Sequence, residues 1–333
     1  MSAASNDTLT MPTQGDIESA YAWWRLLTSV LLMTIAGVGM YAVMVVLPTI
    51  QLEFGVDRGA AALPFTVIML GFGFGGVFMG RLSDRYGITV PLTVAACALC
   101  LGFALAGRST TLGQFTAVHG VLIGFFGISA TFAPLLADIS HWFVRRRGLA
   151  VAICACGNYL AGAIWPPIIQ HFLETVGWRQ TFTGIGIFCV VTMLPLALVL
   201  RRRLAHFEES VDAAGQAGTR RSLGLSPPQL TALLFIAGLG CCVAMSMPQV
   251  HLVALCSDLG FGAARGAEML SLMLGLGVIS RLVFGLISDR IGGLRTLLLG
   301  STMQGIALLL FLPANGLVSL YLVSGLFGLF QGG

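Results

Sequence analysis

Long apolar stretches alternate with short polar or charged segments along almost the whole chain. The hydrocarbon core of a bilayer is about 30 Å thick, so a helix that crosses it needs about 20 apolar residues. Ten stretches come close to that length, which predicts an all-α integral membrane protein of about ten helices. The predicted helices cover residues 26–50, 61–79, 90–107, 113–137, 149–170, 181–200, 230–256, 267–287, 294–312 and 317–333.

One polar segment is much longer than the others and divides the chain unequally. It begins with Arg201-Arg202-Arg203 and ends near Pro227-Pro228. Charged, small and proline residues in such a run are typical of a solvated linker. The sequence therefore predicts a polar N-terminal tail at 1–25, a six-helix bundle at 26–200, a linker at 201–229 and a four-helix bundle at 230–333.

An eight-residue segment occurs once in each predicted bundle. Residues 80–87 read Gly-Arg-Leu-Ser-Asp-Arg-Tyr-Gly and residues 285–292 read Gly-Leu-Ile-Ser-Asp-Arg-Ile-Gly, so five of the eight positions are identical. The copies lie 205 residues apart, and each stands between two apolar stretches. Two charged turns at equivalent places predict a chain of two related halves, an architecture found in many secondary transporters.

The composition supports a membrane environment. Hydrophobic residues make up 56% of the chain and charged residues 10%, with a mean hydropathy of +0.90, whereas a soluble domain carries about 25% charged residues. The eight cysteines fall mostly within apolar stretches and lack zinc or redox spacing, so we interpret them as packing residues. The glycine-rich run at 71–76 lies within an apolar helix, where packing explains it better than phosphate binding. No enzyme activity, cofactor or metal site is predicted.

The arginines determine the predicted orientation. Lysine is absent, so all 18 basic residues are arginine. With the N-terminus in the cytoplasm, 13 arginines fall in cytoplasmic segments and 4 in outer loops, and Arg281 is left within an apolar stretch. This bias follows the positive-inside rule and explains the net charge of +4 without nucleic-acid binding. The acidic start of the chain is unlike a signal peptide, so we expect the first helix to be retained.

Both repeated turns match the glycine-x-x-x-aspartate-arginine-x-glycine loop signature of the major facilitator superfamily. The chain therefore resembles this superfamily over its whole length. The resemblance implies a fold of two six-helix bundles in the plasma membrane, a bacterial inner membrane. Helices 11 and 12 have no counterpart in the sequence, so the second bundle is incomplete. We expect a fragment or an interrupted reading frame rather than a natural truncation.

Three further stretches are similar to monocarboxylate-porter and oxalate/formate-antiporter relatives of bacterial type. They are residues 142–150 with Gly157-Asn158, the turn at 177–179 (Gly-Trp-Arg), and residues 251–260 with Arg281. The arginine usual in helix 4 of drug/proton antiporters is not evident, since the chain reads Ala-Val-His-Gly-Val at 117–121.

Arg281 is the sharpest candidate for substrate binding. An unpaired guanidinium within an apolar helix costs at least about 2.5 kcal/mol on insertion scales, and its planar fork suits a carboxylate. The similar porters carry an arginine at this place in helix 8, which implies that it holds the substrate anion. The alternative is that Arg281, four residues before Gly285, snorkels to the cytoplasmic interface. Those porters tend to carry an aspartate where this chain has Gly277, which leaves proton coupling through such a pair unsupported.

Helices 1, 4, 7 and 10 line the cavity in this superfamily, and this implies further candidates. His119 and His251 could carry a proton, because histidine titrates near pH 6.5; the alternative is a neutral histidine bonded to a neighbouring helix. In helix 5, Asn158 could donate a hydrogen bond to the substrate and Trp165 could form a wall of the cavity. The alternative for Asn158 is a hydrogen bond that joins two helices. The full set of lining candidates is Tyr41, His119, Asn158, Trp165, Gln249, His251 and Tyr321.

A gating role is predicted for the two repeated turns. Charge pairs at helix ends can hold one state of a transporter closed, and glycines let helices approach each other. The alternative is that the arginines only anchor the topology, but the repeated aspartate favours gating. The predicted gating residues are Gly80, Asp84, Arg85, Gly87, Gly285, Asp289, Arg290 and Gly292.

Together these features predict a secondary transporter that moves a small organic anion across the lipid bilayer by alternating access. A monocarboxylate is the first choice of substrate, and coupling to protons is left open. A drug/proton antiporter is the first alternative. A non-transporting membrane sensor, or an inactive truncated transporter, is the second.

Overall fold

The computed structural model describes residues 18–143, 146–201 and 227–331, and the regular structure in these ranges is helical. Eight helical segments are long and apolar enough to cross a membrane, and two shorter apolar helices, Leu294–Leu309 and Leu317–Gln331, follow them. The ten predicted helices are thereby confirmed as helices. The tail up to residue 17 and the linker at 202–226 lie outside the described residues.

The first half of the chain contributes six of the long apolar segments. The first, Ala20–Phe54, is divided into α1 and α2, and the fourth, Leu112–Trp142, contains a π-helical segment η2 and a 3-10 turn η3 between α5 and α6. The elements are α1 (Ala20–Ala36), α2 (Val38–Phe54), α3 (Arg58–Tyr86), α4 (Thr89–Ala106), α5 (Leu112–Val118), η2 (His119–Gly127), η3 (Ile128–Thr131), α6 (Ala133–Trp142), α7 (Arg147–Val176) and α8 (Trp178–Val199). The second half contributes α10 (Pro227–Asp258), α11 (Ala263–Ile291), α12 (Gly293–Leu309) and α13 (Leu317–Gln331).

Several helices begin earlier and end later than their apolar stretches predict. The first helix begins at Ala20, within the predicted tail, and Ser19 accepts a hydrogen bond from the Ala22 backbone N–H there. The third element begins at Arg58, where Asp57 Oδ1 accepts a bond from Ala60 N–H at 2.7 Å. Such caps satisfy the first N–H groups of a helix. Polar ends therefore prolong the helices beyond the segments that hydropathy detects.

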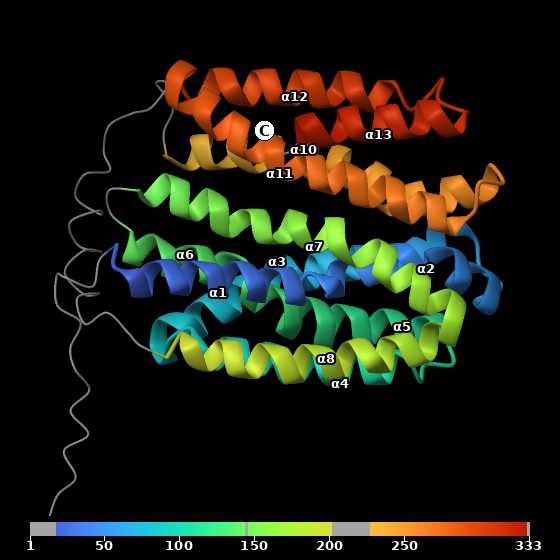
Figure 1. The fold of residues 1–333 in the computed structure, drawn as a ribbon, viewed down its shortest axis with the longest axis horizontal. Coiled ribbons are helices and arrows are strands. Elements are labelled where there is room, and N and C mark those ends of the chain that lie inside the picture. The colour runs from blue at the N-terminus through green and yellow to red at the C-terminus, as the bar shows by residue number, and fades with distance from the viewer. Residues whose placement is uncertain (1–17, 144–145, 202–226, 332–333) are drawn as a thin grey trace, which may run out of the picture.

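The helices form two groups, α1–α8 and α10–α13, which meet along α7 and α11 (Figure 1). A second contact between the groups joins α2 to α10. The starts of α1 and α10 and the end of α8 lie on the left of Figure 1, and we call this side the linker end. The opposite side, where α2 and α10 end, is the distal end.

The two repeated turns have the same backbone shape. Gly87 ends α3 with φ 80° and ψ 165°, and Gly292 follows α11 with φ 84° and ψ 154°. Glycine adopts positive φ without the steric cost that a Cβ would add. This requirement explains why the last glycine of the signature occurs in both copies.

A close helix contact also recurs in the two halves. A Cβ on Gly124 would lie 2.7 Å from the Ile68 carbonyl oxygen, and a Cβ on Gly328 would lie 2.2 Å from the Met273 carbonyl oxygen. Ile68 and Met273 are separated by 205 residues, the same distance as the two signatures. The duplication inferred from one short motif therefore extends to helix packing.

The glycine-rich run of α3 serves packing on one face of that helix. A Cβ on Gly71 would lie 2.3 Å from the Gly120 carbonyl oxygen, and one on Gly75 would lie 2.3 Å from that of Phe125. Added Cβ atoms on Gly73 and Gly76 would meet nothing within 4 Å. Small residues of this kind let membrane helices approach closely, so the packing interpretation is confirmed for one face of the run.

Large apolar side chains cover the outer surface of the helices. On α3, Leu70, Phe74 and Val77 are all more than half exposed. In water such a surface would promote association, whereas a lipid environment solvates it at no cost. The outward faces therefore contact lipid, and the core lies within each group of helices and between them.

Candidate substrate site between the two halves

Arg281 lies on α11 well away from either end of that helix and is half-buried. Ten residues separate it from the end of α11 at Ile291, which corresponds to about 15 Å of helix rise. The Arg281 guanidinium carbon lies 5.4 Å from the centroid of the Tyr159 ring, on α7 of the other half. Its aromatic contact therefore crosses the boundary between the halves.

Arg281 has no acidic partner among the residues that the structure describes. The ion pairs found there join Arg25 to Asp138, Arg58 to Asp258, Arg179 to Glu53, and Arg265 to Glu268. A guanidinium in a low-dielectric interior attracts an anion far more strongly than it would in water. Arg281 is thus a positive charge at the half boundary that is available to an anionic ligand.

A buried hydrogen-bond network lies beside Arg281 and crosses between the halves. Tyr159 Oη donates to the Gln331 carbonyl oxygen at 3.2 Å, which joins α7 to α13. Gln249 Nε2 donates to Gln331 Oε1 at 2.9 Å, and Gln331 Nε2 donates to the Met273 carbonyl oxygen at 3.1 Å. Both glutamine residues are 4% exposed. Phenol and amide groups here can donate to and accept from a polar ligand.

Two of these residues, Tyr159 and Gln331, were not predicted from the sequence. Tyr159 follows the predicted candidate Asn158, but the apolar pattern of helix 5 gives no helical phase. Gln331 is a polar residue near the end of an apolar stretch, which was the one signal that could have identified it. Gln249 and Arg281 were predicted, and the structure brings both to the network.

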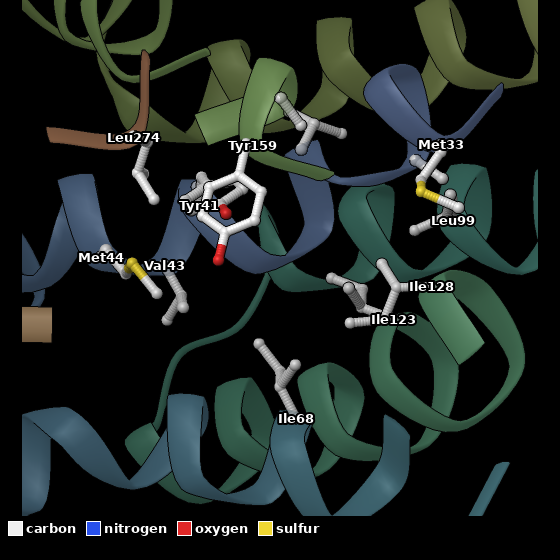
Figure 2. Close-up of a cluster of buried hydrophobic side chains, with 14 of the residues drawn as sticks. Met33, Tyr41, Val43, Met44, Ile68, Leu99, Ile123, Ile128, Tyr159 and Leu274 are labelled. Carbon is white, nitrogen blue, oxygen red and sulfur yellow. The ribbon is translucent and has the colours of Figure 1, made fainter. Parts of the chain in front are cut away.

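Tyr41 lies at the same boundary. It is buried, and its hydroxyl donates to the Asn158 carbonyl oxygen at 3.2 Å. A Cβ on Gly162 would meet Leu274 of the second half at 2.3 Å and the Tyr41 ring at 2.6 Å. Figure 2 shows Tyr41 and Tyr159 together with Leu274 among the buried side chains. The backbone carbonyl of Asn158, and not its side-chain amide, therefore accepts the hydrogen bond from Tyr41.

Three predicted lining residues contact neighbours away from this network. His119 is fully buried; its Nδ1 lies 2.8 Å from the Phe115 carbonyl oxygen, and its ring packs against Phe115 and Phe182. Trp165 Nε1 donates to the Thr34 carbonyl oxygen at 2.8 Å. Tyr321 donates to Glu268 within the second half. Their role in substrate binding stays a prediction that these contacts do not support.

His251 lies on the distal half of α10 and is half-buried. Its Nδ1 makes no hydrogen bond with any described residue. Two turns further along α10, Asp258 forms an ion pair with Arg58 at the start of α3. This is the one ion pair among the described residues that joins the two halves, and it lies at the distal end.

The predicted gating residues lie at the linker end. Asp84, Arg85 and Arg290 are exposed, and the side chain of Asp289 lies outside the described residues. Added Cβ atoms on Gly80 and Gly285 would meet nothing within 4 Å, so the described helices do not need these glycines for close approach. The gating role of the two turns therefore stays a prediction.

The turn at 177–179 has a structural explanation within the first half. Gly177 has φ 82° and separates α7 from α8. Trp178 Nε1 and Arg179 Nη2 both donate to the Glu53 carboxylate at 2.5 Å, and Arg179 Nη1 also donates to the carbonyl oxygens of Gly107 and Ser109. This motif fastens α2, α4 and α8 together at the distal end.

Comparison with known proteins places these features in context. The sequence matches the Major Facilitator Superfamily over residues 29–333. It is 31% identical to bovine monocarboxylate transporter 13 over 263 residues, which cover 76% of this chain and 59% of that protein. It is 26% identical to the MFS-type transporter opdF of Penicillium oxalicum over 255 residues, covering 76% of this chain and 58% of that protein. The chain thus spans somewhat more than half the length of these relatives.

The fold agrees with this assignment. A bacterial homologue of the human lysosomal transporter Spinster, solved in an inward-facing and unoccupied conformation, superposes with a TM-score of 0.70 at 15% identity. The superposition covers 94% of this chain and 73% of that one. The matched family, the shared fold and the eight long apolar helical segments identify a multi-pass membrane protein. The chain belongs to the Major Facilitator Superfamily.

Proposed function

We propose that the protein moves a small organic anion, with a monocarboxylate as the first choice, by alternating access. The observation that carries this proposal is Arg281, a half-buried guanidinium at the boundary of the halves without an acidic partner among the described residues. Keeping such a charge inside a membrane protein is costly, and intramembrane charges mark substrate or ion pathways. A carboxylate would supply the missing counter-charge through two parallel hydrogen bonds.

The neighbouring groups fit a small ligand. Tyr159 Oη donates to the Gln331 backbone carbonyl oxygen, and the side-chain amides of Gln249 and Gln331 bond to each other. These three side chains are buried, and phenol and amide groups can bond the polar atoms of a ligand. Monocarboxylate transporter 13, at 31% identity, supports a carboxylate as the substrate class. The arginine bias of the sequence favours a cytoplasmic position for the linker end.

The substrate assignment is tested by uptake into proteoliposomes. Labelled short carboxylates should accumulate, and Arg281→Gln should raise KM by about tenfold to a hundredfold, because a hydrogen bond to a charged group contributes about 1.5–3 kcal/mol. Arg265→Gln, which alters an exposed pair with Glu268, is the matched control and should leave KM unchanged. Unchanged KM in Arg281→Gln would remove Arg281 from the site, and resistance to hydrophobic cations without carboxylate uptake would favour a drug/proton antiporter.

Coupling to protons, if present, requires a titratable group near the half boundary. His251 is the candidate, because its Nδ1 is not bonded by any described residue and the Arg58–Asp258 pair lies on the same side of the molecule. Uptake stimulated by an inward proton gradient should then lose that stimulation in His251→Gln while keeping its KM at neutral pH. Stimulation that persists in His251→Gln would exclude this residue as the proton site.

A further inference from the structure

Gly277 occupies a position where a glycine needs an explanation. It is buried in the middle of α11, one turn before Arg281. Glycine is a poor residue for a helix interior because it loses more backbone freedom than alanine does. A Cβ at Gly277 would lie 2.6 Å from Tyr159 Cδ1, 2.8 Å from Tyr159 Cε1 and 3.3 Å from Gln331 Nε2. The Tyr159 ring thus packs in the space that a side chain at position 277 would occupy.

The Tyr159 ring joins three elements once it packs on Gly277. Its face lies beside the Arg281 guanidinium, with 5.4 Å between the guanidinium carbon and the ring centroid. Its hydroxyl donates to the Gln331 carbonyl oxygen on α13. Tyr159 is 6% exposed, so solvent competes little with these contacts. The ring position on α7 therefore determines where Arg281 and Gln331 stand relative to each other.

A guanidinium interacts differently with an aromatic face than with a carboxylate. The ring attracts the guanidinium through its quadrupole but does not neutralise its charge. A carboxylate in the same place would form a bidentate pair and use two of the N–H donors. Tyr159 can therefore stabilise Arg281 in the membrane interior without neutralising its charge.

We propose that Gly277 and Tyr159 are paired positioning residues of the anion site, an inference that rests on the proposed function. Gly277 admits the ring, and the ring holds the Arg281 guanidinium in place without a fixed counter-ion. Tyr159, from the opposite half, fills the space that a side chain at position 277 would need. An acidic side chain at this position would therefore clash with the ring, and none can pair with Arg281 from there. The substrate carboxylate then becomes the partner of Arg281.

Two neighbouring glycines provide a matched test in carboxylate uptake. Gly277→Ala should raise KM by about tenfold, because its Cβ displaces the ring that holds Arg281. Gly275→Ala is the control, since its Cβ would meet the Ala163 Cβ at an ordinary 3.7 Å; its KM should stay within about twofold of the wild type. Equal KM values in the two variants would overturn the inference.

Variants of Tyr159 test the mechanism itself. Tyr159→Leu should raise KM, and adding Gly277→Ala to it should change KM little further, because the ring that the new methyl group would displace is already gone. Tyr159→Phe keeps the ring and should keep most of the anion affinity. Two results would show that the ring does not position Arg281. One is a double variant whose KM increase is the product of the two single increases, and the other is an affinity loss in Tyr159→Phe as large as that in Tyr159→Leu.

A measurement without substrate separates this inference from the proposed function. In detergent, Gly277→Ala should melt at a lower temperature than Gly275→Ala, and Tyr159→Leu should remove that difference. Absence of carboxylate uptake by the wild type would refute the proposed function, whereas these differences in melting temperature would still test the pairing of Gly277 with Tyr159. A lower melting temperature for Gly277→Ala that persists in Tyr159→Leu would refute the pairing even where uptake is normal.

Discussion

Two arginines within helices illustrate two uses of the same side chain. Arg25 is 1% exposed and is fully engaged: its Nε and Nη2 donate to Asp138 at 2.7 Å, and Nη1 donates to the Leu200 carbonyl oxygen at 3.1 Å. Its guanidinium also lies 4.7 Å from the centroid of the Trp142 ring. Arg281 has an aromatic contact of the same kind but no acidic partner among the described residues. The first arrangement fastens helices, and the second is the one on which the proposed anion site rests.

The Arg25 pair makes a prediction about stability. Arg25→Gln leaves the Asp138 carboxylate partly buried without its counter-charge, and breaking a buried pair in this way costs about 3–5 kcal/mol. We expect a markedly lower melting temperature in detergent, measured by loss of the monodisperse protein on heating. Arg265→Gln removes an exposed partner of Glu268 and serves as the control. Similar melting temperatures for the two variants would contradict the structural role of Arg25.

At this scale the sequence identified some of the residues that lie near Arg281 and missed others for one physical reason. Arg281 contacts Tyr159 across the half boundary, Gln249 bonds to Gln331 beside it, and Tyr41 packs near Gly162 and Leu274. His119 and Trp165 instead bond within the first half. Lipid and protein interior are both apolar, so hydropathy along a membrane helix does not reveal which face points to the cavity. A polar residue in such a helix is visible in the sequence, but its direction is not.

Helix packing through glycine gives a prediction for α3. Gly75→Ala would place its Cβ against the Phe125 carbonyl oxygen, which is backbone and cannot rotate away. Overpacking of this kind costs about 1–3 kcal/mol. The adjacent Gly76 faces open space, so Gly76→Ala should be neutral or stabilise the helix by up to about 1 kcal/mol. Melting temperatures in detergent compare the two, and a larger loss in Gly76→Ala would contradict the observed packing.

The existence of the helices was predictable, but their irregularities were not. The segment η2 (His119–Gly127) is π-helical within a stretch that reads as uniformly apolar. Its glycines accept close neighbours: a Cβ on Gly120 would lie 2.2 Å from Val67 Cγ1, and one on Gly127 would lie 2.7 Å from Leu99 Cδ2. The widened turn thus occurs where α3 and α4 press against the same segment. Such tertiary constraints are absent from a hydropathy profile.

For the whole molecule, the duplication was the most informative sequence feature. A single motif repeated after 205 residues predicted two related halves, and the recurring Gly124–Ile68 and Gly328–Met273 contacts agree with it. How the halves meet could not be predicted, because a repeated motif shows which segments are equivalent and not which segments touch. The contact instead runs along α7 and α11 and includes the Ser271 hydroxyl, which donates to the Ala163 carbonyl oxygen.

The Arg58–Asp258 pair makes a prediction about the balance between conformations. The pair joins the halves at the distal end, and its side chains are 33% and 57% exposed. An exposed pair contributes about 0–1 kcal/mol, so Asp258→Asn should shift the equilibrium towards distal opening by at most about fivefold. The labelling rate of Ser271→Cys by an impermeant thiol reagent, in a background without the native cysteines, should rise accordingly. Exchanging the charges, Arg58→Asp with Asp258→Arg, should restore the slow rate.

We propose that an anion held by Arg281 drives the two halves to rock about the site between them. Spin labels report this directly through two distances, Asp57 to Leu259 at the distal end and Arg85 to Arg290 at the linker end. On addition of a transported carboxylate, these two distances should change in opposite directions in the wild type and stay fixed in Arg281→Gln. Wild-type distances that do not respond to the carboxylate, or that both lengthen or both shorten, would refute the rocking motion.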